Sequence, residues 1–102
     1  MEKWLRSTDE HELYNLKNVE NISIKQNNNE FKLVISYFNG REYEIRLECE
    51  NIKEAEKIFK NIQIYIELPK SSIIDIPICK EGILYWFKMQ IVCHLCVTVV
   101  SG

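Results

Sequence analysis

The feature that most constrains the fold is an Asn39-Gly40 pair between two runs in which polar and apolar residues alternate. The runs are residues 31–38, FKLVISYF, and residues 41–48, REYEIRLE. Alternation with a period of two indicates β-strands, and an Asn-Gly pair between two such runs predicts a β-hairpin. The sequence therefore predicts an antiparallel sheet.

The length of the hairpin loop decides which side chains face the core. A two-residue loop would place the apolar residues of the second run on the face that carries Lys32 and Ser36 in the first. A three-residue loop over residues 38–40, with Gly40 in a left-handed conformation, aligns the apolar residues of both runs. These residues are Phe31, Leu33, Ile35 and Tyr37 with Tyr43, Ile45 and Leu47. We therefore expect the three-residue loop, with Tyr37 and Tyr43 on the same face.

Shorter patterns predict further strands. Residues 27–29, three asparagines, favour a turn that brings an earlier strand into the sheet, with Ile22 and Ile24 facing inward. Trp4-Leu5 is a candidate first strand. Residues 8–20 fit either a helix entered at Ser7 or a short strand over Leu13–Asn15 followed by a turn. The asparagines in this stretch favour the strand.

One helix is predicted over residues 52–66. Its apolar residues recur at intervals of three and four, which is typical of an amphipathic helix; they are Ile52, Ala55, Ile58, Phe59, Ile62, Tyr65 and Ile66. Asn51 is a suitable N-cap, and Glu54 forms a capping-box-like pair with it. Pro69 prevents much continuation. A sheet with one apolar face and a helix with one apolar stripe are expected to pack together.

The chain is expected to form a single α+β domain over residues 1–102. Its antiparallel sheet, roughly residues 20–49, is packed by the amphipathic helix within a sheet-plus-helix part, residues 1–67. Residues 68–102 form a more apolar C-terminal part, and Pro69 marks the boundary between the two. A chain of 102 residues can bury one core without help.

The apolar stretch ILYWFKMQIVCHLCVTVV, residues 83–100, carries one full charge, Lys88. Its length approaches that of a membrane span, so a C-terminal membrane anchor is one hypothesis. Lys88, Gln90 and His94 are costly in the middle of a span, and they favour a core element or a homodimer interface. Helical and strand spacings are both present, and the β-branched residues 97–100 favour strands.

Cysteine and histidine are the candidate residues for metal binding, redox chemistry or catalysis. The four cysteines are Cys49, Cys79, Cys93 and Cys96. The motif Cys93-His94-Leu95-Cys96 has the spacing of half a zinc site, but the sequence offers no second pair at metal-ligand spacing. We expect buried reduced thiols and neither metal nor cofactor, with zinc binding and redox chemistry as alternatives. His11 and His94 accompany no nucleophile pattern, so we expect no enzymatic activity.

The charge balance bears on partners and location. The chain has 13 Lys and Arg against 15 Asp and Glu, a net charge of −2. Direct nucleic-acid binding requires a basic stripe, so we expect none. The N-terminal residues MEKWLRSTDEHE contain no apolar signal segment, which favours a cytoplasmic location.

An acidic row follows the second hairpin strand. It comprises Glu42, Glu44, Glu48 and Glu50, with Glu30 at the open end of the hairpin. Such alternation is the ordinary wet face of an antiparallel sheet. It is also compatible with binding, because spaced carboxylates imitate a phosphate backbone and can occupy a basic groove on a protein partner. Phe38 and Tyr14 are then candidate apolar anchors.

Residues 31–62, FKLVISYFNGREYEIRLECENIKEAEKIFKNI, resemble the acidic hairpin and following helix of small phage anti-CRISPR proteins, especially those that block the DNA-recognition groove of a CRISPR effector. The resemblance implies a stoichiometric phage inhibitor that acts in the host cytoplasm. It also implies that Glu42, Glu44, Glu48 and Glu50 fill the groove.

Three functional hypotheses result from the sequence. The first is a non-enzymatic binding protein of the anti-CRISPR kind, whose partner is a protein with a basic groove. The second is an oligomeric sponge for a small nucleotide signal, which requires Lys and Arg around a pocket between subunits. The third is a small protein anchored in a membrane by residues 83–100.

Overall fold

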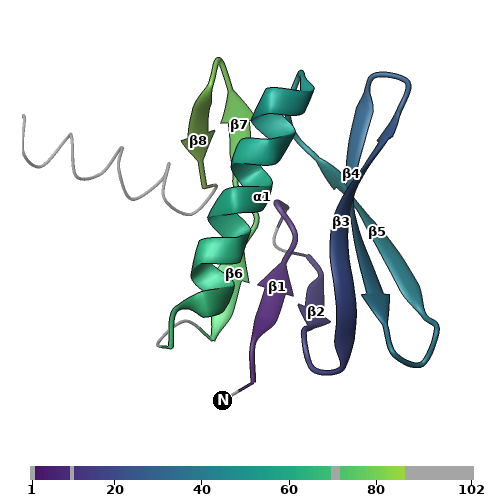
Figure 1. Cartoon of the computed structure of the whole chain (residues 1–102). Coiled ribbons are helices and arrows are strands. Elements are labelled where there is room, and N and C mark those ends of the chain that lie inside the picture. The colour runs from purple at the N-terminus through teal and green to yellow at the C-terminus, as the bar shows by residue number, and fades with distance from the viewer. Residues whose placement is uncertain (1, 10, 70–71, 87–102) are drawn as a thin grey trace, which may run out of the picture.

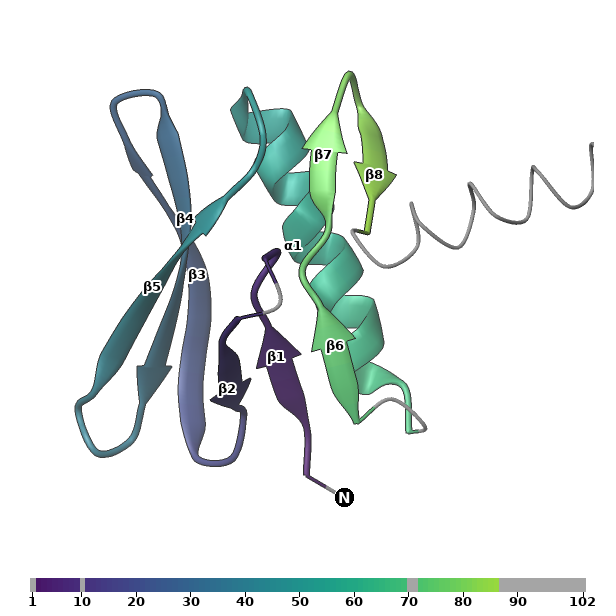
Figure 2. The same cartoon turned by 180° about the vertical axis from the view of Figure 1, so that it is seen from behind.

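The computed structural model describes residues 2–9, 11–69 and 72–86. Within these ranges one helix, α1 (Ile52–Glu67), accompanies eight strands (Figures 1 and 2). The strands are β1 (Trp4–Arg6), β2 (Leu13–Asn15), β3 (Val19–Asn27), β4 (Glu30–Tyr37), β5 (Glu42–Leu47), β6 (Ile73–Asp75), β7 (Ile78–Lys80) and β8 (Ile83–Tyr85). Antiparallel pairing predominates and helix α1 packs with the sheets, so the predicted α+β fold class is confirmed.

The antiparallel sheet β3-β4-β5 contains the predicted hairpin. Phe31 pairs with Leu47, Leu33 with Ile45 and Ile35 with Tyr43. The loop has three residues, because the backbone N–H of Tyr37 donates to the carbonyl of Arg41 at 2.9 Å across residues 38–40. Gly40 has a φ of +90°, in the left-handed region that glycine adopts without strain. The predicted register and loop are confirmed.

The preceding strand also pairs as predicted. Ile22 of β3 lies opposite Ile35 and Ile24 lies opposite Leu33, and both β3 side chains pack against the core. The turn into β4 places Asn28 at a φ of +56°, a conformation that asparagine tolerates better than most residues. The asparagine run therefore forms the expected turn.

The N-terminal strands belong to a separate mixed sheet, β2-β1-β6. Short strands at Trp4-Leu5 and at Leu13–Asn15 were predicted and are confirmed. Their pairing was not predicted: β1 is antiparallel to β2 but parallel to β6. Arg6 donates to the Asp75 carboxylate from Nε at 2.5 Å and from a terminal nitrogen at 3.1 Å, a two-pronged ion pair across the parallel strands.

Capping groups fix both ends of helix α1. The Asn51 side chain accepts a hydrogen bond from the backbone N–H of Glu54 at 2.9 Å, as the sequence predicts. The Glu54 carboxylate accepts from the N–H of Glu50 at 2.8 Å and from that of Gly82 at 2.8 Å, which ties the β7–β8 turn to the helix. At the other end, the Lys3 ammonium donates to carbonyls of the last turn, where the helix dipole favours a cation.

The core lies where α1 meets the sheets. Ala55, Ile58 and Ile62 form the buried stripe of the helix, which contacts β3, β4, β6 and β7. Ile52 is 43% exposed, so its predicted place in the buried stripe is wrong. It is the first residue of the helix, and the buried part of the stripe begins one turn later, at Ala55. Figure 1 shows α1 alongside β6 and β7, with β1 and β2 between them and the sheet β3-β4-β5.

The described portion of the C-terminal part completes the core. Ile74, Ile76 and Cys79 are each 2% exposed, in agreement with the apolar character of this part. Residues 83–85 form strand β8, whereas residues 87–102 lie outside the described ranges. The choice between core element, homodimer interface and membrane anchor for residues 83–100 therefore falls mostly outside them. No helix of the described ranges is long and apolar enough to cross a membrane.

Candidate binding surface

The six predicted site residues all lie at the surface of the hairpin and its flanks. Glu42 and Glu44 project from the outer face of β5, Glu48 and Glu50 follow that strand, and Glu30 opens β4; all are exposed. Phe38 occupies the hairpin loop and is 71% exposed. The side chains thus lie where the sequence placed them, on surfaces open to water.

Basic side chains interrupt the acidic row, an arrangement that was not predicted from the sequence. The register sets Lys25, Lys32 and Arg46 side by side on the same outer face. Glu44 lies 3.3 Å from the Lys25 ammonium and 3.4 Å from that of Lys32, and hydrogen bonds from these lysines lower the pKa of the Glu44 carboxyl. Arg46 lies 4.0 Å from Glu30. The outer face is therefore of mixed charge.

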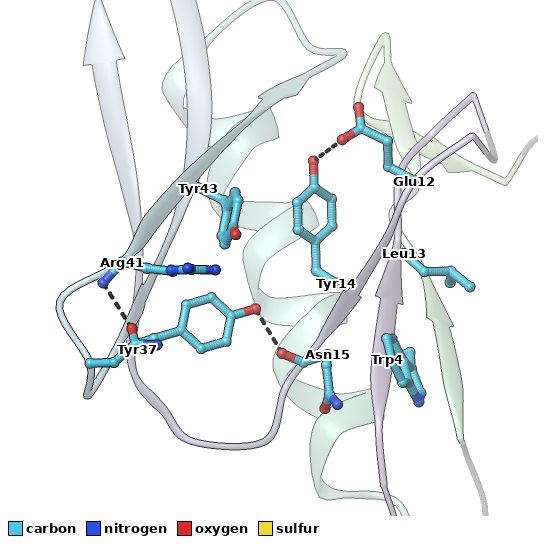
Figure 3. Close-up of a pocket in the computed structure, with 9 residues that line it drawn as sticks. Trp4, Glu12, Leu13, Tyr14, Asn15, Tyr37, Arg41 and Tyr43 are labelled. Carbon is cyan, nitrogen blue, oxygen red and sulfur yellow. Dashed lines mark hydrogen bonds between the residues drawn. The ribbon is translucent and has the colours of Figure 1, made fainter.

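A groove with a volume of about 440 Å³ lies on the opposite face of the hairpin, against strands β1 and β2 (Figure 3). We call it the tyrosine groove. Its lining residues are Trp4, Glu12, Leu13, Tyr14, Asn15, Tyr37, Asn39, Arg41 and Tyr43. The predicted placement of Tyr37 and Tyr43 on one face is confirmed, and it creates one wall of this groove.

The ring of Tyr43 packs against the rings of Tyr14 and Tyr37 in the groove. The ring centroids of Tyr14 and Tyr43 are 5.7 Å apart, and those of Tyr37 and Tyr43 are 5.8 Å apart with the rings perpendicular. Aromatic pairs at such distances contribute about 0.5–1.5 kcal/mol per pair beyond area burial. The three rings therefore form one packed aromatic wall.

Two of the tyrosine hydroxyls are held by hydrogen bonds. Tyr37 donates to the carbonyl of Asn15 at 2.7 Å, which links the two sheets, and Tyr14 donates to Glu12 at 2.8 Å. Burial, followed by the hydrogen bond and charge of Glu12, raises the pKa of Tyr14 to about 12. Burial raises the pKa of Tyr37 as well. Both hydroxyls are therefore neutral donors at physiological pH.

The groove carries opposite charges at its two ends. Figure 3 shows the Arg41 side chain reaching between Tyr37 and Tyr43 toward Tyr14, while Glu12 lies at the other end beyond the Tyr14 hydroxyl. The guanidinium of Arg41 forms no ion pair with the residues that the structure describes. A guanidinium beside partly exposed tyrosine rings can contact an anionic group of a ligand.

Sequence reasoning identified Tyr14 and Phe38 as anchors but missed Trp4 and Arg41. The alternation in residues 41–47 puts Arg41 on the same face as Tyr43, so this placement could have been read from the pattern. Trp4 could not have been placed, because it reaches the groove only through the pairing of β1 with β2.

The described cysteines are free thiols. The expected burial is found at Cys79, whereas Cys49 is only partly buried. Burial is the main reason that the pKa of Cys49 rises to about 11, and it raises the pKa of Cys79 too. Cys93 and Cys96 lie outside the described residues, so the zinc alternative falls outside them as well. Residues 2–9, 11–69 and 72–86 contain no cluster of ligand side chains that could hold a metal ion.

Comparisons with protein-family models, with curated proteins and with solved structures find no match to this chain.

Proposed function

We propose that the chain is a non-enzymatic binding protein whose partner is a protein, held at the tyrosine groove and the adjoining Phe38 loop. The observation that carries this proposal is the concentration of aromatic side chains in a single open groove, together with an arginine that forms no ion pair with the described residues. Tyrosine, tryptophan and arginine are the residues most enriched at the energetic centres of protein interfaces.

Prior ordering of the groove also supports binding. The hydroxyl bonds of Tyr14 and Tyr37 and the ring contacts of Tyr43 fix these side chains before a partner arrives. Immobilising a flexible side chain on binding costs about 0.5–1.5 kcal/mol, so rings already held avoid much of that cost. Phe38 is 71% exposed and lies in the chain between the lining residues Tyr37 and Asn39, so it offers a further apolar contact.

The acidic residues have a narrower role in this proposal than simple phosphate mimicry. Glu44 and Glu30 already face lysine and arginine side chains. Glu42, Glu48 and Glu50 form no ion pair with the described residues, and they are available to a basic partner. Exposed charges of this kind chiefly raise the association rate. The resemblance to anti-CRISPR proteins makes a CRISPR effector the first partner to test.

Binding to purified CRISPR effectors, measured together with their DNA cleavage, tests the proposal. We expect the wild-type chain to bind one effector and to inhibit its cleavage at stoichiometric amounts. Tyr43→Ala should raise the dissociation rate, because it removes an anchor. Lysine at positions 42, 48 and 50 together should lower the association rate, most strongly at low salt. Glu56→Lys, on the exposed side of α1, is the control for a charge reversal away from the hairpin.

Two outcomes separate the parts of the proposal. If no effector binds, the assignment to this partner class is wrong. The groove is then tested with partners captured from bacterial lysate, by comparing wild type with Tyr43→Ala. If every captured protein binds both forms equally, the tyrosine groove is not the binding surface.

A further inference from the structure

We propose that the tyrosine groove binds an extended peptide segment of the partner that carries an acidic side chain at the Arg41 end and a basic side chain at the Glu12 end. This inference rests on the proposed protein-binding function and specifies the chemistry of the bound segment. It is carried by the charges at the ends of the groove and by the polar groups of its lining.

The Arg41 end selects a carboxylate. Arg41 presents a planar fork of N–H donors that matches a carboxylate in two-pronged geometry. The Arg41 backbone carbonyl accepts a hydrogen bond from the N–H of Tyr37, and the Arg41 N–H donates to the Asn39 side chain. These bonds hold the backbone of Arg41 and leave its guanidinium available. Figure 3 shows that this side chain reaches into the groove.

The Glu12 end selects a cation. One carboxylate oxygen of Glu12 accepts from the Tyr14 hydroxyl, and the second has no hydrogen-bond partner among residues 2–9, 11–69 and 72–86. A lysine or arginine of the bound segment would supply that partner. A nucleotide fits this arrangement less well, because its phosphates would meet one cation and the negative charge of Glu12.

Two amide side chains of the groove lining, those of Asn15 and Asn39, suit a peptide backbone. The side-chain oxygens of Asn15 and Asn39 accept from the backbone N–H groups two residues ahead, at 2.9 Å in each case. These turns orient the amides, whose NH₂ groups are unpartnered within the described residues. Peptide carbonyls accept from such donors, while apolar side chains of the segment cover the tyrosine rings.

Selection from a displayed library of random short peptides tests the inference. Against the folded wild-type chain, we expect enrichment of sequences that carry both an acidic and a basic residue. Arg41→Glu should replace the acidic preference by a basic one, and Glu12→Lys should replace the basic preference by an acidic one. Lys60→Glu, on the exposed side of α1, should leave both preferences unchanged. Circular dichroism establishes that each variant is folded.

The affinity of one selected peptide, made synthetically, is then measured for wild type and for Arg41→Ala. Its Kd should rise about 10-fold to 100-fold on Arg41→Ala, the range expected for losing a hydrogen-bonded charge pair. Enrichment that is the same on Arg41→Glu as on wild type would overturn the inference. So would tight binding of a cyclic dinucleotide that is lost on Arg41→Ala. If partner capture depends on Tyr43 while peptides show no charge preference, the protein-binding function stands and the peptide chemistry is wrong.

Discussion

The hydrogen bond from Tyr37 to Asn15 is expected to stabilise the whole fold, because it joins the two three-stranded sheets. The hydroxyl of Tyr37 at the end of β4 donates at 2.7 Å to a carbonyl of β2, 22 positions away in sequence. Tyr37→Phe removes this donor and keeps the ring that packs against Tyr43. A neutral hydrogen bond contributes about 0.5–1.5 kcal/mol net.

The site determines where in that range the loss should fall. Asn15 is half-buried, so water can replace the lost donor only in part. We therefore expect the free energy of unfolding to fall by about 1–1.5 kcal/mol. For a domain of this size, each kcal/mol lowers the Tm by about 4–8 °C.

Urea unfolding followed by circular dichroism measures this loss directly. Tyr43→Phe is the matched control, since the Tyr43 hydroxyl donates to no atom of the described residues and the ring contacts are kept. This control should change the free energy of unfolding by less than about 0.5 kcal/mol. Equal midpoints for the two variants would show that the Tyr37 bond does not couple the sheets.

Three further predictions concern other parts of the fold. Hydrogen bonds from two backbone N–H groups lower the pKa of Glu54 below 4.5, so its carboxylate stabilises the fold at neutral pH. Glu54→Gln should therefore lower the urea midpoint at neutral pH. The difference in midpoint between this variant and wild type should shrink as the pH falls below 4.5. The pKa of Tyr14 rises from 10.0 to about 12, so stability measured by urea unfolding should fall as pH rises through that interval, and less steeply in Tyr14→Phe. Gly40→Ala should cost about 1–2 kcal/mol in the same assay, because the φ of +90° strains any residue with a Cβ; an unchanged midpoint would contradict this.

The hairpin and the helix could be predicted because each carries a periodic pattern long enough to be unambiguous. Only one loop length keeps the apolar residues of both hairpin strands together, and the register that results assigns Tyr43 to the same face as Tyr37. The N-cap at Asn51 depends on residues close in sequence, so it too could be predicted.

The mixed sheet and most of the groove could not be predicted. β1, β2 and β6 have three residues each, too few to show a period. The pairing of β1 with β6 joins two segments that are far apart in the sequence, with helix α1 in the intervening chain. The partners of Glu44 were missed for a similar reason, since Lys25 and Lys32 approach it across strands rather than along one. Tertiary contacts decided all of these placements.

The parallel pairing of β1 with β6 has a consequence for how the chain folds during synthesis. Arg6 of β1 pairs with Asp75 of β6, which is synthesised 69 positions later. Until then β1, the central strand of its sheet, has only β2 as a neighbour. Closing so long a loop before its contacts form slows folding. The β1–β2 pair therefore leaves the ribosome with an open edge, and stays available for wrong pairing until β6 has emerged.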